Sequence, residues 1–237
     1  MSNDPAERVR NRLLRRLSSQ IYERLLPHFK AISFESGDVL YEAHSPIEFI
    51  YFPQDCVLSA VTMMEDGSGI EVGTSGNEGA AGLAAFIGPS VSPHRLLAQV
   101  PGDGLGIEAD TLAREAKANP ALFDLLLRHF HAFLSQMSQS VACNGLHPIL
   151  KRCCRWLLMT HDRVGCDELP LTHEFLSFML GVRRPGVTET LQALQKKGTI
   201  ANGRGTVTII DRAAIEAMTC ECYGIVVKEY ERLLGPA

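Results

Sequence analysis

The sequence predicts an α+β fold, with a β-rich N-terminal half joined by one long helix to a C-terminal unit of short helices and a hairpin. Short apolar runs between turn residues fill positions 31 to 112, and no glycine or proline occurs between Pro120 and Gly145. A helix, a glycine turn, a second helix and a hairpin then follow from 171 to 212. The 237 residues, 46% of them hydrophobic, suffice for one large domain or two ordinary ones.

The N-terminal 1–30 segment is expected to form an amphipathic helix over residues 6–26, ending near Pro27. Arginines separate apolar residues at helical spacing: Val9, Leu13, Leu14, Leu17, Ile21, Leu25 and Leu26. No apolar stretch typical of a signal peptide follows, and no run approaches the ~18 residues of a membrane helix. Seven unevenly spaced cysteines do not form a disulfide pattern. We therefore expect a cytoplasmic protein without a membrane partner.

Residues 31–118 are expected to form an antiparallel sandwich or barrel. Clusters of glycine, proline, aspartate and asparagine separate the apolar runs, and residues 65–69 are expected to form a hairpin turn. The strands are expected at 38–41, 49–52, 57–62 and 96–100.

Residues 119–146 are expected to form one long helix. Asn119 is a suitable N-cap, and Pro120 suits the first helical position. Apolar residues recur at three- and four-residue steps, close to a heptad seam: Phe123, Leu126, Phe130, Phe133 and Met137. The stripe could pack on the β module or pair with a second copy of the helix, and we expect the dimer.

Residues 147–213 are expected to form a winged helix-turn-helix. Pro148 opens a helix that runs to about His161, and Thr172 caps a short second helix. Gly181 can take the left-handed conformation after that helix, and Pro185 suits the first turn of the next, which stops at Gly198. Residues 199–210 read as a hairpin wing.

This unit has the charge and side chains expected of a DNA-binding module. Residues 31–120 carry 3 basic and 13 acidic side chains, whereas residues 148–212 carry 10 and 6, which suggests that only one part of the chain meets a polyanion. Arg183 and Arg184 stand where an arginine fork could read guanine, and Lys196, Lys197 and Arg204 where phosphates would be met. The alternative is a three-helix packing unit with a polar face.

On these residues the chain resembles the Crp/Fnr superfamily of bacterial transcription regulators, most strongly over 148–212. The resemblance implies a cyclic-nucleotide-binding-like β-roll sensor, a long dimerisation helix and a winged helix-turn-helix. It also implies that Thr172 touches phosphate and that Arg184 reads a guanine. Pro185 replaces a base-reading glutamate of many members, and Glu189 replaces an arginine of the catabolite activator. The docking should therefore be similar and the target sequence different, with Thr188 and Gln192 as further candidate contacts.

The resemblance also implies an effector pocket around Gly76, Glu78 and Gly79, where Glu78 would take the place of a ribose-binding glutamate. The family's Arg-Ser pair is absent, and the nearby Arg95 does not restore the pattern. A cyclic phosphate would then have only backbone donors. The sequence is compatible with a small-molecule effector but does not require one, it disfavours cyclic AMP, and it predicts no certain cofactor.

The cysteines and histidines predict neither a metal site nor catalysis. An iron–sulfur sensor of this family would need N-terminal cysteines, and residues 1–55 contain none. Buried structural thiols or a redox-responsive thiol remain as the two interpretations. His129 and His131 stand two apart on a predicted helix, a poor spacing for one zinc ion. No catalytic motif occurs, so we do not expect an enzyme.

Together these features predict a homodimeric regulator that binds a pseudo-palindromic double-stranded DNA site, with RNA polymerase as a candidate second partner. The alternative is a signalling or scaffold protein whose winged helix contacts a protein. The tail, residues 214–237, is expected to be a further helix packed against the wing domain.

Overall fold

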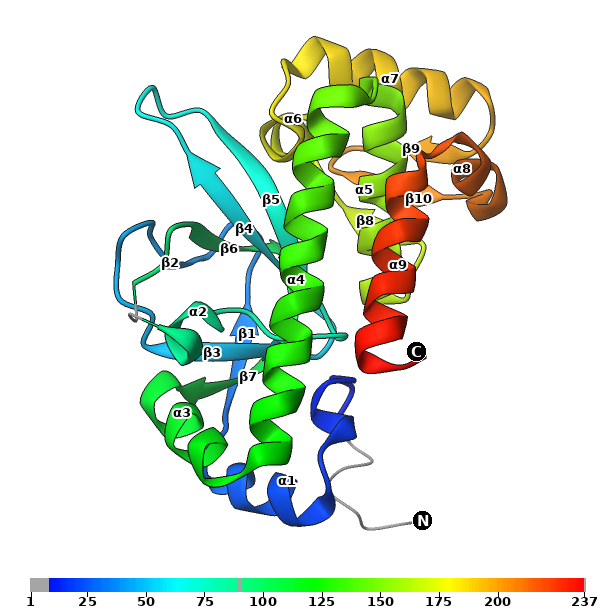
Figure 1. The fold of residues 1–237 in the computed structure, drawn as a ribbon. Coiled ribbons are helices and arrows are strands. Elements are labelled where there is room, and N and C mark those ends of the chain that lie inside the picture. The colour runs from blue at the N-terminus through cyan, green and yellow to red at the C-terminus, as the bar shows by residue number, and fades with distance from the viewer. Residues whose placement is uncertain (1–8, 89–90, 237) are drawn as a thin grey trace.

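The computed structural model describes residues 9–88 and 91–236, and Figure 1 shows their arrangement. The N-terminal segment contains η2 (Leu14–Arg16), α1 (Ser19–Leu25) and η3 (Leu26–His28). The β module contains β1 (Lys30–Phe34), β2 (Val39–Tyr41), β3 (Phe49–Pro53), β4 (Val57–Met63), β5 (Gly69–Ser75), α2 (Ala84–Ile87), β6 (Arg95–Val100) and β7 (Gly102–Glu108). Then follow α3 (Ala109–Ala118), α4 (Pro120–Leu146), α5 (Ile149–Val164), β8 (Glu168–Pro170), α6 (His173–Leu180), α7 (Arg184–Lys196), β9 (Ile200–Asn202), β10 (Thr206–Ile209), α8 (Arg212–Met218) and α9 (Glu221–Leu234).

The β module consists of two antiparallel sheets, with strand orders β2-β6-β4-β5 and β1-β7-β3. The four expected strands and the 65–69 hairpin turn are confirmed, because β4 pairs with β5 on either side of that turn. Strand β7 was not expected, because its glycine-rich sequence resembles a loop. Its glycines serve packing: a Cβ on Gly104 would lie 2.9 Å from the Phe34 ring, and one on Gly106 would lie 2.6 Å from Ile32.

The long helix α4 is confirmed, and the Asn119 side chain accepts hydrogen bonds from the backbone at its start. The prediction of which apolar face of α4 is exposed was partly wrong. Leu126 is buried against the β module, and the Phe133 ring lies over Gly73 of β5. Five of the apolar residues of α4 that remain at least partly exposed recur at heptad spacing, and we call them the exposed seam: Leu127, Phe130, Leu134, Met137 and Val141.

The expected N-terminal helix is interrupted. Leu17 is extended, and Ser18 begins a separate helix as its N-cap. Upstream, the buried Asn11 side chain donates to the carbonyls of Pro53 and Gly79, which fixes this segment on the β module. Local side-chain hydrogen bonds thus compete with a continuous helix. Residues 6–8 of the expected helix lie outside the described residues.

The tail is helical, and its first part packs where we expected, because Ile215 of α8 lies in the core of the helix-turn-helix unit, whereas α9 packs elsewhere. Figure 1 shows α9 lying alongside α4 and running in the opposite direction, so that the C-terminal end returns toward the β module. The Tyr230 ring meets the buried His129 ring edge-on at 6.1 Å, and Arg16 donates to the carbonyls of Gly235 and Pro236. The apolar face of α9 packs mainly on α4 rather than on the wing. Among the described residues, no helix is both long and apolar enough to cross a membrane.

A buried ion pair joins the β module to α5. The Nε of Arg163 donates to Glu78 at 2.9 Å, and the same guanidinium donates to Gln136 of α4 at 3.0 Å and to the Met159 carbonyl at 2.7 Å. Burial opposes the charged guanidinium, yet the Glu78 carboxylate raises the pKa of Arg163 above its ordinary value. The Arg163 guanidinium therefore joins the β module, α4 and α5.

A second polar contact links β5 to α5. Nε1 of Trp156, the only tryptophan, donates to the partly buried Glu71 carboxylate at 3.3 Å, and Ser59 donates to the same oxygen at 2.9 Å. Burial outweighs these hydrogen bonds and raises the pKa of Glu71 to about 7.

We expect Arg163→Met to lower the free energy of unfolding by about 3–5 kcal/mol, because Glu78 would be left buried without a counter-charge. Adding Glu78→Gln should restore much of the loss, since the amide oxygen can still accept from the Gly76 backbone. Urea unfolding of the two variants measures this. A loss below about 1 kcal/mol in the single variant would show that the pair is not a buried unit.

We expect stability to fall as pH rises from about 4.5 to about 7, because folded Glu71 keeps its proton where the unfolded chain has lost it. Trp156 fluorescence should change with a midpoint near pH 7. In the matched Glu71→Gln variant, that fluorescence transition should vanish and the stability profile should flatten. An unchanged transition in the variant would assign it to a histidine instead.

Candidate functional site

The helix-turn-helix forms as the sequence predicted. Thr172 caps α6 by accepting from the Phe175 backbone at 3.1 Å, and Gly181 ends it in the left-handed conformation with φ +60°. A side chain at Gly181 would also collide with Ile70 of β5, at 2.6 Å. The turn glycine therefore serves both the helix end and the contact with the β4–β5 hairpin.

Helix α7 presents a polar face to solvent. Its buried side carries Val187, Leu191 and Leu194, which fix how the helix is rotated on its neighbours. All but one of the contact residues predicted on α7, directly before it and at the cap of α6 are exposed. The exposed ones are Thr172, Arg183, Arg184, Pro185, Glu189, Gln192, Lys196 and Lys197. The structure thus brings most of them to one surface, with Arg183 and Arg184 at the N-terminal end of α7.

The exception is Thr188, which is partly buried and held by a neighbour. Its hydroxyl lies 2.9 Å from Nδ1 of His173 at the start of α6, and the opposite ring nitrogen lies 3.2 Å from Oδ1 of Asn202 in the wing. The sequence analysis missed this link, because nothing in the local pattern places His173 beside the wing. One imidazole therefore sets the spacing of α6, α7 and β9.

Two of the exposed cations have partners at the edge of this surface. Arg184 lies 3.8 Å from Glu174, a weak contact between two exposed side chains. The ammonium group of Lys197 lies 3.6 Å from the Met218 sulfur, on the side of α7 toward α8. Arg184 can therefore leave its partner at little cost, and Lys197 lies off the centre of the polar face.

The wing is a three-stranded sheet of order β8-β10-β9, one strand more than expected. Arg204 stands exposed in the turn between β9 and β10, next to Gly205 with φ +78°. This turn allows a cation to project from the tip of the wing.

Of the four predicted effector residues, Glu78 lines a cavity of about 320 Å³ beside Arg163 and Tyr230, but protein side chains fill the space around the glycine cassette. Glu78 is paired with Arg163, and a Cβ on Gly76 would lie 2.5 Å from the Arg163 side chain. A Cβ on Gly79 would lie 2.1 Å from the His129 ring, and Arg95 pairs with Glu42. The glycine cassette therefore packs against α4 and α5, and protein side chains occupy the place expected for a ligand.

A different cavity lies between the β module and α4, with a volume of about 250 Å³. None of the predicted effector residues lines it. Its wall is mostly apolar and includes Leu58, Leu96, Phe130, Phe133 and Met137. This cavity can accept a small apolar molecule.

Three of the seven cysteines gather in a place that the sequence analysis did not foresee. Cys143, Cys220 and Cys222 are buried together beside His147, although 77 positions separate Cys143 from Cys220. Cys143 and His147 are one helical turn apart, and this i, i+4 spacing was the local signal that could have been noticed. Cys154 is buried elsewhere, and burial raises its pKa to about 11, which disfavours a redox-reactive thiolate there.

Comparison with known proteins agrees with this architecture. Residues 151–218 match the Crp-like helix-turn-helix domain. FixK2 from Bradyrhizobium japonicum is similar over 81% of this chain and 98% of its own, with 16% identity and a TM-score of 0.70. A putative Crp/Fnr regulator from Eubacterium rectale is similar over 87% of this chain and 96% of its own, with 17% identity and a TM-score of 0.67. The c-di-GMP-responsive regulator CLP from Xanthomonas campestris is similar over 81% of this chain and 99% of its own, with 15% identity and a TM-score of 0.66.

No curated protein matches the chain in sequence. At identities this low, the likeness to solved structures establishes the fold, and the domain match identifies a helix-turn-helix module within it. The chain therefore carries a Crp-like helix-turn-helix domain within the fold of the Crp/Fnr transcription regulators.

Proposed function

We propose that this protein is a sequence-specific DNA-binding transcription regulator that inserts α7 into the major groove. The observation that carries the proposal is the exposed polar face of α7, with Arg183 and Arg184 at its N-terminal end, inside a Crp-like helix-turn-helix. In such motifs the N-terminal residues of the second helix contact base edges. No catalytic step is part of this function.

The contacts divide into base reading and phosphate binding. Arg184 suits bidentate hydrogen bonds to guanine, and Gln192, two turns along the same face, suits adenine. Glu189 is a third exposed polar side chain of α7 and can accept from a cytosine amino group. Thr172, Lys196 and Arg204 surround this face and suit phosphates, which give affinity without sequence information.

We propose that α4 pairs with α4 of a second copy through the exposed seam. Leu134 and Val141 have 51% and 69% of their surface exposed, a costly arrangement for a helix in water. Two-fold pairing would present two α7 helices to half-sites about one DNA turn apart, roughly 34–36 Å. The target is then a pseudo-palindrome.

The cavity beside α4 is the proposed effector site. Phe130, Leu134 and Met137 belong both to the cavity wall and to the exposed seam, so a bound molecule would shift the side chains that pair the dimer. The wall offers few polar partners, and burying a phosphate there would be unfavourable. The effector class is therefore a small, uncharged and largely apolar molecule.

We expect wild-type protein to enrich a two-fold symmetric motif from genomic DNA fragments. Arg184→Ala should weaken specific binding by about 1–3 kcal/mol and relax one position in each half-site. Arg204→Ala should instead weaken all sequences alike and lower the dependence of log affinity on log salt concentration by about one unit. An equal and uniform loss of DNA affinity in both variants would contradict the assigned roles. DNA binding that does not depend on salt concentration in the wild type or either variant would favour a protein partner.

We expect Leu134→Glu to convert a dimer to a monomer, because it places two carboxylates opposite each other in an apolar seam. Light scattering after gel filtration measures the mass. Val39→Glu is a matched control, since Val39 is 47% exposed on β2 and is not part of the exposed seam. Pairing through another surface would leave both variants dimeric.

A further inference from the structure

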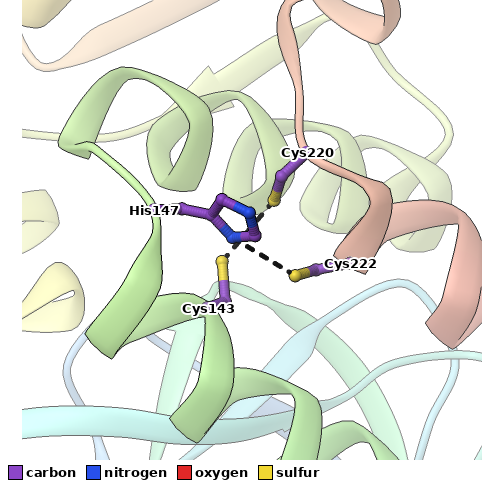
Figure 2. A group of neighbouring side chains, drawn as sticks. All are labelled: Cys143, His147, Cys220 and Cys222. Atoms are coloured by element: carbon purple, nitrogen blue, oxygen red, sulfur yellow. Dashed lines mark hydrogen bonds between the residues drawn. The ribbon is translucent and has the colours of Figure 1, made fainter.

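Four metal-ligating side chains converge where α4 ends and α9 begins. Cys143 and His147 come from the last turn and the C-cap of α4, and Cys220 and Cys222 come from the N-cap and first turn of α9. One ligand atom from each lies within 4.8 Å of all the others. Figure 2 shows the three sulfur atoms gathered around the imidazole ring.

The spacing of these atoms suits one tetrahedral ion. Cys143 Sγ and Cys220 Sγ are 3.6 Å apart, and Cys222 Sγ is 3.5 Å from Nδ1 of His147. Tetrahedral zinc with ordinary bond lengths would give about 3.8 Å between two sulfurs and about 3.5 Å between sulfur and nitrogen. A disulfide would instead need two sulfurs at about 2.05 Å.

The surroundings also resemble those of a metal site. The outer ring nitrogen of His147 lies 3.4 Å from the Glu221 carboxylate, a contact that would orient the imidazole with Nδ1 toward an ion. Gln139 donates to Cys222 Sγ at 3.1 Å, a hydrogen bond that suits a thiolate ligand. The three cysteine side chains are buried together as a cluster of their own.

We propose that Cys143, His147, Cys220 and Cys222 bind one Zn²⁺ ion as a closed Cys₃His site. All four positions would be filled by protein ligands, which is typical of structural rather than catalytic zinc. Binding replaces up to three thiol protons, which are released to solvent. Three thiolates and Zn²⁺ leave one negative charge, and the Arg155 guanidinium interacts electrostatically with Cys143.

The ion would link α4 to α9 at the short connection between α4 and α5. Helix α4 ends at Leu146 and α5 begins at Ile149, so His147 lies in the short connection between them. Zinc there would tie α9 to the end of α4 and fix the direction in which the helix-turn-helix leaves it. This site stands on its own geometry and does not depend on the proposed DNA binding.

The test begins with the full-length protein purified with zinc and freed of loose metal. Elemental analysis should find about one zinc per chain in the wild type and in the control Cys166→Ser, whose thiol is exposed and outside the cluster. Cys143→Ser and Cys222→Ser should each lose most of it. Equal zinc in all four proteins, or none in the wild type after zinc supply, would overturn the proposal.

Cobalt keeps the test valid if a variant fails to fold. Wild-type protein stripped of metal should take up about one Co²⁺ with the visible bands of a tetrahedral ion and near-ultraviolet sulfur-to-cobalt absorption, both displaced by Zn²⁺. Hydrogen exchange at residues 140–147 and 220–224 should slow when Zn²⁺ is added. An octahedral cobalt spectrum, a bound iron–sulfur chromophore or unchanged exchange would contradict a zinc clasp.

Discussion

The buried Arg163–Glu78 pair is the interaction on which the relation between the two halves depends. One guanidinium binds the β module through Glu78 and α4 through Gln136, while its own backbone belongs to α5. Neither charge can be left alone in such a place without a large cost, so the three elements are held in one arrangement. The orientation of the helix-turn-helix unit follows from it, because α5 is the first helix of that unit.

The same interaction explains why the glycine cassette is not a ligand pocket. Gly76 and Gly79 leave room for Arg163 and His129, and Glu78 is committed to its cation. A separate and mostly apolar cavity lies between the β module and α4. The residues of the cassette therefore serve the packing of the β module on α4 and α5.

Three further contacts hold the helix-turn-helix unit from other directions. Ile70 at the β4–β5 hairpin packs on Gly181, Trp156 donates to Glu71, and α9 returns along α4. The proposed zinc clasp would add a fourth contact at the connection between α4 and α5. A signal at α4 would therefore act on a set of discrete contacts, and a change in one of them could redistribute the orientations of the unit.

The sequence by itself determined the elements whose signals are local. Asn119 and Thr172 as caps, Gly181 in the left-handed conformation and the 65–69 turn need only neighbouring atoms, and the α4 and helix-turn-helix predictions were confirmed for that reason. Only the tertiary structure decided which face of α4 is free, where α9 packs and what Glu78 binds. The tertiary structure also decided that Cys143 and Cys220 come together. All four features depend on contacts between residues tens of positions apart, and no periodicity in the sequence encodes the geometry of such contacts.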